Sequence, residues 1–458
     1  MLTPLLHDGD RELTEGTGKI RAMLVIEQCN PKWPSVPLVG YKFYRHIAKL
    51  AQVTLVTHVR KEKALRSLHP DAEIVVIQES AFLAGWHKIA TRLSTLRGRT
   101  IWPLYHTLTY PTYADFDPKV LREFGSRITA GHFDVVHAIT LMMPRYPYSV
   151  RKVCGETPLI IEPINGGVPY PASFGKIAKS EFSFLNWLRT VGRYFLSGCR
   201  QTYDRADYVF SGSEFTKKLL EDLFTLKRKI EVLAENGLDA SFFAEQTGDH
   251  SPRESDKLQL LFVGRLVPYK GADIAIDALS LLPPMQREKT WLTIVGDGPE
   301  RESLQAKVDE ADLNSSVRFV GWVPQEVTQT YYRSADVFCF PSIREFGGAV
   351  VLEAMASNLP CIVVNNGGVA EYVTETAGCK IEPLSREYVV AEVAQALRKL
   401  HEAPDLRRAM GLAAGQRARD YTWCGKAHCG KAQRIVATYQ ALLREKRFKR
   451  DASQGAVA

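Results

Sequence analysis

The sequence has no stretch of about 18 uncharged apolar residues, and residues 1–20 lack the apolar run of a signal peptide. This pattern predicts a cytoplasmic protein without a spanning helix, and it leaves open a peripheral position on the inner face of a membrane. The eight cysteines are scattered and none forms a CxxC pair, which argues against a disulfide framework and favours reduced core thiols. The chain also has no short-period repeat and no nucleic-acid motif, so we expect no nucleic-acid partner.

The composition is that of an ordinary globular protein, with 458 residues that are 45% hydrophobic and 24% charged. This length exceeds one typical domain and predicts two domains of about 200 residues each. The formal net charge of +8 favours anionic partners, such as anionic lipid or a phosphorylated substrate.

Short apolar runs rich in β-branched residues alternate with helical patterns, as in sheets of buried parallel strands. This alternation of strands and helices stops at the polar stretch 241–257 and continues after it. We therefore predict an α/β protein with an N-terminal domain over 1–240, a linker over 241–257, a C-terminal domain over 258–420, and a helix with a basic tail over 421–458. The expected strands lie within 22–28, 53–58, 73–78, 133–139, 158–164 and 207–213, and then within 258–264, 291–296, 317–321, 336–340, 360–364 and 378–383.

Two strand ends of the second half carry glycines and cations. The first strand ends at Gly264 and is followed by Arg265 and Lys270, two cations that can clamp a diphosphate. The next strand ends at Gly296 and Gly298, which let the backbone approach a ligand closely. The alternative interpretation of the first stretch by itself is a solvated loop with incidental basic residues.

The stretch 342–360 carries the strongest signal. Glu345 precedes Gly347 and Gly348, whose position at a helix start favours an anionic group. Glu353 lies inside that helix, roughly 9 Å further along and among apolar neighbours. A carboxylate buried there needs a partner, which is either the hydroxyls of a ligand or the cation of an internal salt bridge.

A fourth strand is followed by Gly367, Gly368 and Glu371, and the two glycines can form an anion-binding nest. Four successive strand ends of the second half thus converge on one anionic ligand.

Together these motifs resemble family 4 of the retaining glycosyltransferases, the glycosyl transferases group 1, throughout the second half. The resemblance implies the GT-B fold, in which two Rossmann-like doubly wound parallel-sheet domains face a cleft and a C-terminal helix crosses back to the first domain. It implies that Glu345 contacts the donor sugar, Glu353 the ribose, and Arg265 with Lys270 the diphosphate. The family often has an aromatic two residues after the first glutamate, whereas Phe346 follows it directly here.

The first half matches the family less closely. His137 ends an expected strand where the family often has a histidine near the donor sugar, and a structural histidine is the alternative. Acceptor-side loops are expected at Gly40 and at a glycine-rich segment with Asn165, Gly166 and Gly167.

The function that follows is transfer of a hexosyl group from a nucleotide diphosphate sugar to a glycan or lipid-linked acceptor, with retention and without a metal or other cofactor. The pair Asp115 and Asp117 reads as helix-start carboxylates rather than metal ligands, and a metal at Cys424, His428 and Cys429 is disfavoured. The alternatives are a nucleotide-sugar epimerase or hydrolase of the same fold, or a non-catalytic sugar-nucleotide binding protein. The segment 176–200 mixes aromatic and basic residues, which suits either an anionic membrane surface or a core-facing helix.

Overall fold

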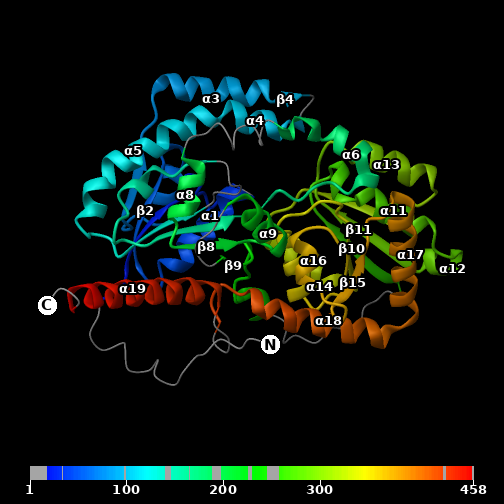
Figure 1. Cartoon of the computed structure of the whole chain (residues 1–458). Coiled ribbons are helices and arrows are strands. Elements are labelled where there is room, and N and C mark those ends of the chain that lie inside the picture. The colour runs from blue at the N-terminus through cyan, green and yellow to red at the C-terminus, as the bar shows by residue number, and fades with distance from the viewer. Residues whose placement is uncertain are drawn as a thin grey trace.

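The computed structural model describes residues 18–33, 35–96, 99–139, 146–164, 166–187, 198–224, 230–244, 257–425 and 430–455. Within them the chain forms two large parallel sheets that lie side by side with helices packed around them (Figure 1). A short antiparallel pair, β4 (Thr95–Leu96) and β5 (Arg99–Thr100), lies outside both sheets. The predicted α/β class with two doubly wound domains is confirmed.

The first sheet has seven strands in the order β3-β2-β1-β6-β7-β8-β9. Its central strands are buried on both faces, which explains their near-continuous apolar sequences. The strands are β1 (Arg21–Val25), β2 (Gln52–His58), β3 (Ile74–Ile77), β6 (Val135–Ile139), β7 (Leu159–Ile164), β8 (Tyr208–Ser211) and β9 (Ile230–Val232).

The second sheet has six strands in the order β12-β11-β10-β13-β14-β15, which is the Rossmann order. The order reverses between β10 and β13, and in the first sheet between β1 and β6. In open parallel sheets a ligand binds at this reversal, outside the carboxyl ends of the strands. The strands are β10 (Leu258–Val263), β11 (Thr290–Val295), β12 (Val317–Gly321), β13 (Val337–Phe340), β14 (Cys361–Val364) and β15 (Gly378–Ile381).

Several helices begin at serine caps, because a serine side chain accepts a hydrogen bond from an amide that the first turn leaves unpaired. Ser80, Ser213 and Ser385 cap α3, α9 and α17 in this way. The first half contains α1 (Val36–Ile47), α2 (Glu62–Arg66), α3 (Ala81–Leu93), α4 (Trp102–Leu108), α5 (Tyr110–Thr129), α6 (Gly175–Ser180), α8 (Cys199–Arg205), α9 (Glu214–Leu223) and α10 (Ser241–Ala244). The second half contains α11 (Ala272–Ser280), α12 (Pro284–Glu288), α13 (Arg301–Glu310), α14 (Gln325–Ser334), α15 (Ala349–Ala356), α16 (Gly368–Tyr372), α17 (Arg386–Glu402), α18 (Pro404–Ala418) and α19 (Lys431–Gly455).

Short 3-10 turns supplement the helices in both halves. They are η2 (Val59–Lys61), η3 (Ser149–Lys152), η4 (Ala172–Phe174), η5 (Ser183–Asn186), η6 (Pro268–Lys270) and η7 (Arg419–Tyr421).

The C-terminal segment returns to the first domain, as the resemblance implies. Helix α18 packs on the second domain, and α19 lies along the first, at the lower edge of Figure 1. Trp423, between them, is 1% exposed and packs edge-on against Phe43 and face-on against His46 of α1, both at 4.9 Å between ring centroids. Burying a side chain of this size contributes more than about 2 kcal/mol, so this contact holds the returning segment to α1.

Two local expectations are wrong. Asp115 and Asp117 lie within α5, whose first residue is Tyr110, and not at a helix start. Their carboxylates are used internally, since Asp115 pairs with Lys119 and Asp117 accepts from the amide and hydroxyl of Ser149. Gly40 is buried in the second turn of α1 and does not form a loop.

The expected linker begins in the short helix α10, and its remainder up to residue 256 is outside the described residues. None of the helices described is long and apolar enough to cross a bilayer.

Candidate active site

The reversal point of the second sheet brings Lys270 and Glu345 together. Lys270 ends η6, after β10, and its ammonium donates a hydrogen bond to the Glu345 carboxylate, which follows β13. Their side chains are only 16% and 12% exposed. Gly271 makes the approach possible, because it has a positive φ of 77° and a Cβ there would lie 2.3 Å from the Pro341 carbonyl oxygen. A nearly buried cation and carboxylate thus meet at the edge where a ligand is expected.

The glycines after β14 pack the Glu345 loop. Glu345 forms a parallel bridge with Gly367, and its carbonyl accepts from the Gly368 amide at 3.1 Å. A Cβ at Gly367 would lie 2.0 Å from the Glu345 oxygen, and one at Gly368 would lie 2.0 Å from the Phe346 oxygen. These glycines therefore allow two strand-end loops to lie backbone against backbone.

A similar approach joins the loops after β10 and β11. A Cβ at Gly296 would lie 1.9 Å from the Gly264 carbonyl oxygen, and one at Gly298 would lie 2.4 Å from that of Leu266. Arg265 extends from this junction into solvent, and its guanidinium donates to the Tyr269 hydroxyl at 2.9 Å. The structure thus brings an exposed cation to the same edge of the sheet.

Glu353 is 6% exposed in α15, and among the described residues no cation lies within ion-pair distance of it. Its carboxylate accepts hydrogen bonds from Gln325 at 2.7 Å and from the Tyr332 hydroxyl at 3.1 Å. Burial raises its pKa, while the charge of Lys42 in α1 and the two hydrogen bonds oppose that rise. The internal salt bridge considered as the alternative is therefore not found in the described part of the chain, where two neutral donors hold the carboxylate.

The first domain contacts this loop cluster through residues that the motifs do not single out. A Cβ at Gly347 would lie 1.9 Å from the Glu235 carboxylate and 2.5 Å from the Asn236 amide, both in the segment after β9. Arg344 donates to the Val168 carbonyl at 2.7 Å, and its guanidinium lies 4.8 Å from the ring centroids of both Tyr170 and Phe346. The cation of Arg344, directly before Glu345, was the one signal in the sequence for this contact.

Glu371 joins the two domains, whereas Gly166 and Gly167 pack within the first domain. The Glu371 carboxylate accepts from the Glu214 amide at 2.9 Å, so it occupies the start of α9 in the first domain. Burial raises the pKa of Glu371, and this amide bond opposes the rise. Gly166 is held against α9 by Thr216, and a Cβ at Gly167 would lie 2.5 Å from Leu219.

His137 lies in the interior of the first domain. It is fully buried in β6, where its Nδ1 lies 2.6 Å from the Tyr439 hydroxyl of α19 and its Nε2 lies 3.4 Å from the Glu162 carboxylate. This environment favours the structural alternative for His137. Asn165, His428 and Cys429 lie outside the described residues.

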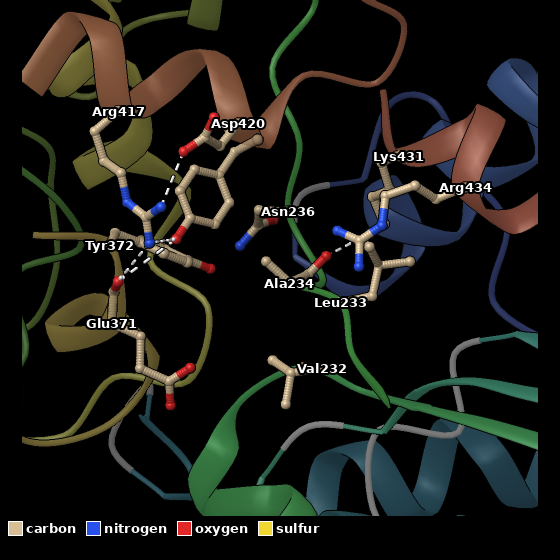
Figure 2. A pocket seen from close by; sticks show the side chains of 12 residues that line it. Val232, Leu233, Ala234, Asn236, Glu371, Tyr372, Arg417, Asp420, Lys431 and Arg434 are labelled. Atoms are coloured by element: carbon tan, nitrogen blue, oxygen red, sulfur yellow. Dashed lines mark hydrogen bonds and ion pairs between the residues drawn. The ribbon is translucent and has the colours of Figure 1, made fainter. Parts of the chain in front are cut away.

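A cavity of about 220 Å³ lies where the chain passes between the domains (Figure 2). On one side of it Arg417 contacts Asp420 and the Tyr421 hydroxyl, each at 2.9 Å, and on the other side Lys431 donates to a carbonyl of the segment after β9. Pockets for drug-sized ligands usually exceed about 300 Å³. Of the predicted site residues only Glu371 lines this cavity, so it is separate from the loop cluster around Glu345.

The fold is that of the GT-B class. It has two Rossmann-like sheets, glycine-rich strand ends where the strand order of the second sheet reverses, and a C-terminal helix that returns to the first domain. Residues 245–417, in the second half of the chain, match the family model of the Glycosyl transferases group 1. The resemblance seen in the motifs is thereby confirmed.

Known proteins support the same assignment. The chain is 30% identical over 245 residues, 49% of its length, to a D-inositol 3-phosphate glycosyltransferase of Kineococcus radiotolerans. The match covers 56% of that protein, so the chain spans about half the length of this curated relative. Among solved structures, a sucrose-phosphate synthase of Thermosynechococcus elongatus has a TM-score of 0.61 at 18% identity, with 93% of this chain and 100% of that one covered. The Anabaena protein Alr3699/HepE, solved with UDP, has a TM-score of 0.56 at 16% identity, with 92% and 99% covered, and both likenesses show the fold.

Proposed function

We propose that the protein is a retaining, metal-independent glycosyltransferase that moves a hexosyl group from a nucleotide diphosphate sugar to a glycan or lipid-linked acceptor. The observation that carries the proposal is the loop cluster at the reversal of the second sheet. There Lys270, Glu345 and Arg265 lie at one edge, and Glu353 follows along α15.

The charges of this cluster suit a donor with a diphosphate. Departure of a nucleoside diphosphate develops negative charge, and each side-chain contact that stabilises it lowers the barrier by about 3 kcal/mol. We assign this role to Lys270 and Arg265. Because Lys270 is paired with Glu345 in the unliganded protein, donor binding would exchange that partner for phosphate oxygens and release the carboxylate to the sugar hydroxyls.

Glu353 is the residue that we assign to the ribose. Its two hydrogen-bond donors are neutral, and the charge of Lys42 acts on it without an ion pair. The carboxylate oxygens can therefore accept further hydrogen bonds from the hydroxyls of a ligand. Uridine is the base to test first, because the Anabaena protein of the same fold is solved with UDP.

Donor binding is tested by calorimetry with UDP, GDP, ADP and their sugar conjugates. We expect one nucleotide to bind the wild type, and Glu353→Ala to weaken it about tenfold or more, the value of a lost hydrogen bond to a charged group. Glu310→Ala, an exposed carboxylate at the end of α13, is the matched control and should bind as the wild type does. Absence of binding by any nucleotide would remove the donor site and favour a protein without this activity.

Transfer is tested with the nucleotide sugar that binds and a panel of glycan and lipid-linked acceptors. Release of nucleotide that needs an acceptor supports the transferase, whereas release of free sugar or a changed sugar without one supports the hydrolase or epimerase. Nuclear magnetic resonance of the new anomeric centre tests retention, and an inverted product overturns it. Turnover that disappears in a chelator and returns with a divalent ion would overturn metal independence.

A further inference from the structure

The outer face of α3 exposes a row of large apolar side chains. Phe82, Ile89 and Leu93 are 78%, 53% and 61% exposed. Their spacing of seven and four residues places them on one side of the helix. The helix is held by other contacts, since Ala90 is fully buried and the Trp86 indole donates to the Leu108 carbonyl of α4 at 2.8 Å. The apolar row is thus presented outward by a helix that is already packed.

Neighbouring elements extend this surface. Trp102 at the start of α4 is 39% exposed, and Phe184 and Trp187 in and after η5 are 61% and 57% exposed. Helix α4 packs against η5, so the two groups belong to one apolar surface. We call this the α3–η5 surface. In Figure 1, α3 and α4 run along the upper edge of the molecule, and α6 lies near the end of that edge toward the second domain.

The charges around the α3–η5 surface are mainly positive, with Glu181 between α6 and η5 as a carboxylate among them. From Ser80 to Ala114 the sequence contains no Asp or Glu, but it contains Lys88, Arg92, Arg97 and Arg99. Lys88 and Arg92 are exposed on α3, and Lys176 and Lys179 are exposed on α6. An exposed apolar face with tryptophans and with an excess of cations beside it is the pattern of a helix that lies in the interface of an anionic bilayer.

The surface also adjoins the candidate active site. Helix α6 packs against η6, and η6 ends at Lys270. A path therefore runs from α3 through α4, η5 and α6 to the Lys270–Glu345 pair.

We propose that the α3–η5 surface inserts into an anionic lipid monolayer and thereby holds the candidate active site at a membrane that carries the acceptor. The insertion of this surface into a lipid monolayer is inferred from the exposure and the charge of its residues alone. The second part, the lipid-borne acceptor, rests on the proposed function.

Vesicle flotation of the full chain tests the proposal. The vesicles are phosphatidylcholine alone and phosphatidylcholine mixed with phosphatidylglycerol in equal amounts. We expect flotation with the mixed vesicles, weak flotation with phosphatidylcholine alone, and loss of flotation as salt is raised. The combined variant Phe82→Ser, Ile89→Ser, Leu93→Ser should lose about a hundredfold or more in vesicle affinity. Lys88→Glu with Arg92→Glu should lose at least about fivefold for each cation.

The matched control is Met285→Ser with Trp322→Ser, two residues of the second domain that are each 73% exposed. This control should float as the wild type does. Flotation of the triple serine variant at the wild-type level would overturn the proposal. A wild type that does not float, but forms a dimer that the triple variant breaks, would also overturn it and make the surface an interface between two copies.

A nucleotide-binding measurement keeps the two proposals apart. The triple variant should bind nucleotide with unchanged affinity, which also shows that it is folded. Flotation without nucleotide binding would support the membrane surface and contradict the donor site. Nucleotide binding without flotation would support the donor site and contradict the membrane surface.

Discussion

Replacing Glu353 by glutamine tests two effects of this carboxylate separately. One is its effect on the free energy of unfolding, and the other is its effect on the affinity for the donor. Glutamine has nearly the same volume and keeps one acceptor oxygen, so the change removes one charge and turns the other oxygen into an NH2 donor, toward which the Tyr332 hydroxyl can turn its own oxygen. The site is favourable for the comparison because Glu353 is 6% exposed and its partners, Gln325 and Tyr332, are neutral.

The expected gain in stability follows from opposing terms. Burial of an ionised carboxylate without a cation costs several kcal/mol. The two hydrogen bonds to the charged oxygens return about 1.5 to 3 kcal/mol each, against about 1 kcal/mol each for a neutral acceptor. We therefore expect Glu353→Gln to raise the free energy of unfolding by about 1 to 3 kcal/mol at neutral pH, which is roughly 2 to 10 °C in Tm for a domain of this size.

The stability difference between the glutamine variant and the wild type should depend on pH. Burial raises the pKa of Glu353 in the fold. A carboxyl group with a raised folded pKa contributes its full stability below its unfolded pKa of about 4.3, and this contribution is lost as the pH rises through the folded pKa. The advantage of the glutamine variant should therefore be small near pH 4 and should grow toward neutral pH.

Differential scanning calorimetry across this pH range measures the stability, and isothermal calorimetry measures donor affinity. We expect the stabilised variant to bind nucleotide about tenfold to a hundredfold more weakly, because a charged acceptor for the ribose hydroxyls is gone. A variant that is less stable than the wild type at neutral pH would refute the reasoning, since the surroundings would then favour the charge. Unchanged nucleotide affinity would refute the ribose assignment.

Three further predictions concern the cluster and the domain contacts. Lys270→Ala should lower kcat/KM for nucleotide release about a hundredfold, measured in steady-state assays, and a change below threefold would contradict its role beside the diphosphate. Tyr439→Phe removes the hydroxyl that lies 2.6 Å from His137, so urea unfolding should show a loss of about 1 to 3 kcal/mol while nucleotide affinity stays unchanged; weaker binding would place His137 in the site after all. Gly347→Ala puts a Cβ 1.9 Å from a carboxylate oxygen of the first domain and should widen the domain arrangement in small-angle scattering, whereas Gly85→Ala, with open space around it, should not.

The place of the loop cluster in the fold was predictable from the order of residues along the chain. Gly264 to Lys270 and Glu345 to Gly348 each follow a buried strand, and parallel strands bring such ends to one edge. The contacts that complete the cluster were not predictable. Asn236 and Arg344 act across the domain boundary, and no local pattern indicates which loop of the other domain will face them.

The wrong predictions for Gly40 and His137 also arose from contacts between segments far apart in the chain. Gly40 suits a turn, but its neighbours form an amphipathic helix that buries it against the first sheet. His137 lies in the middle of β6 rather than at its end, and its partner Tyr439 comes from α19, 302 residues away in the chain.

The sequence by itself determined the α/β class, the two parallel sheets and the glycine-rich strand ends, because strand periodicity and backbone freedom are properties of neighbouring residues. The tertiary structure alone decided that Lys270 meets Glu345, that Glu353 is held by neutral donors, and that α3 turns its apolar row to solvent. The physical reason is that pairing, burial and exposure depend on segments far apart in the chain, whose approach only the packed domains define.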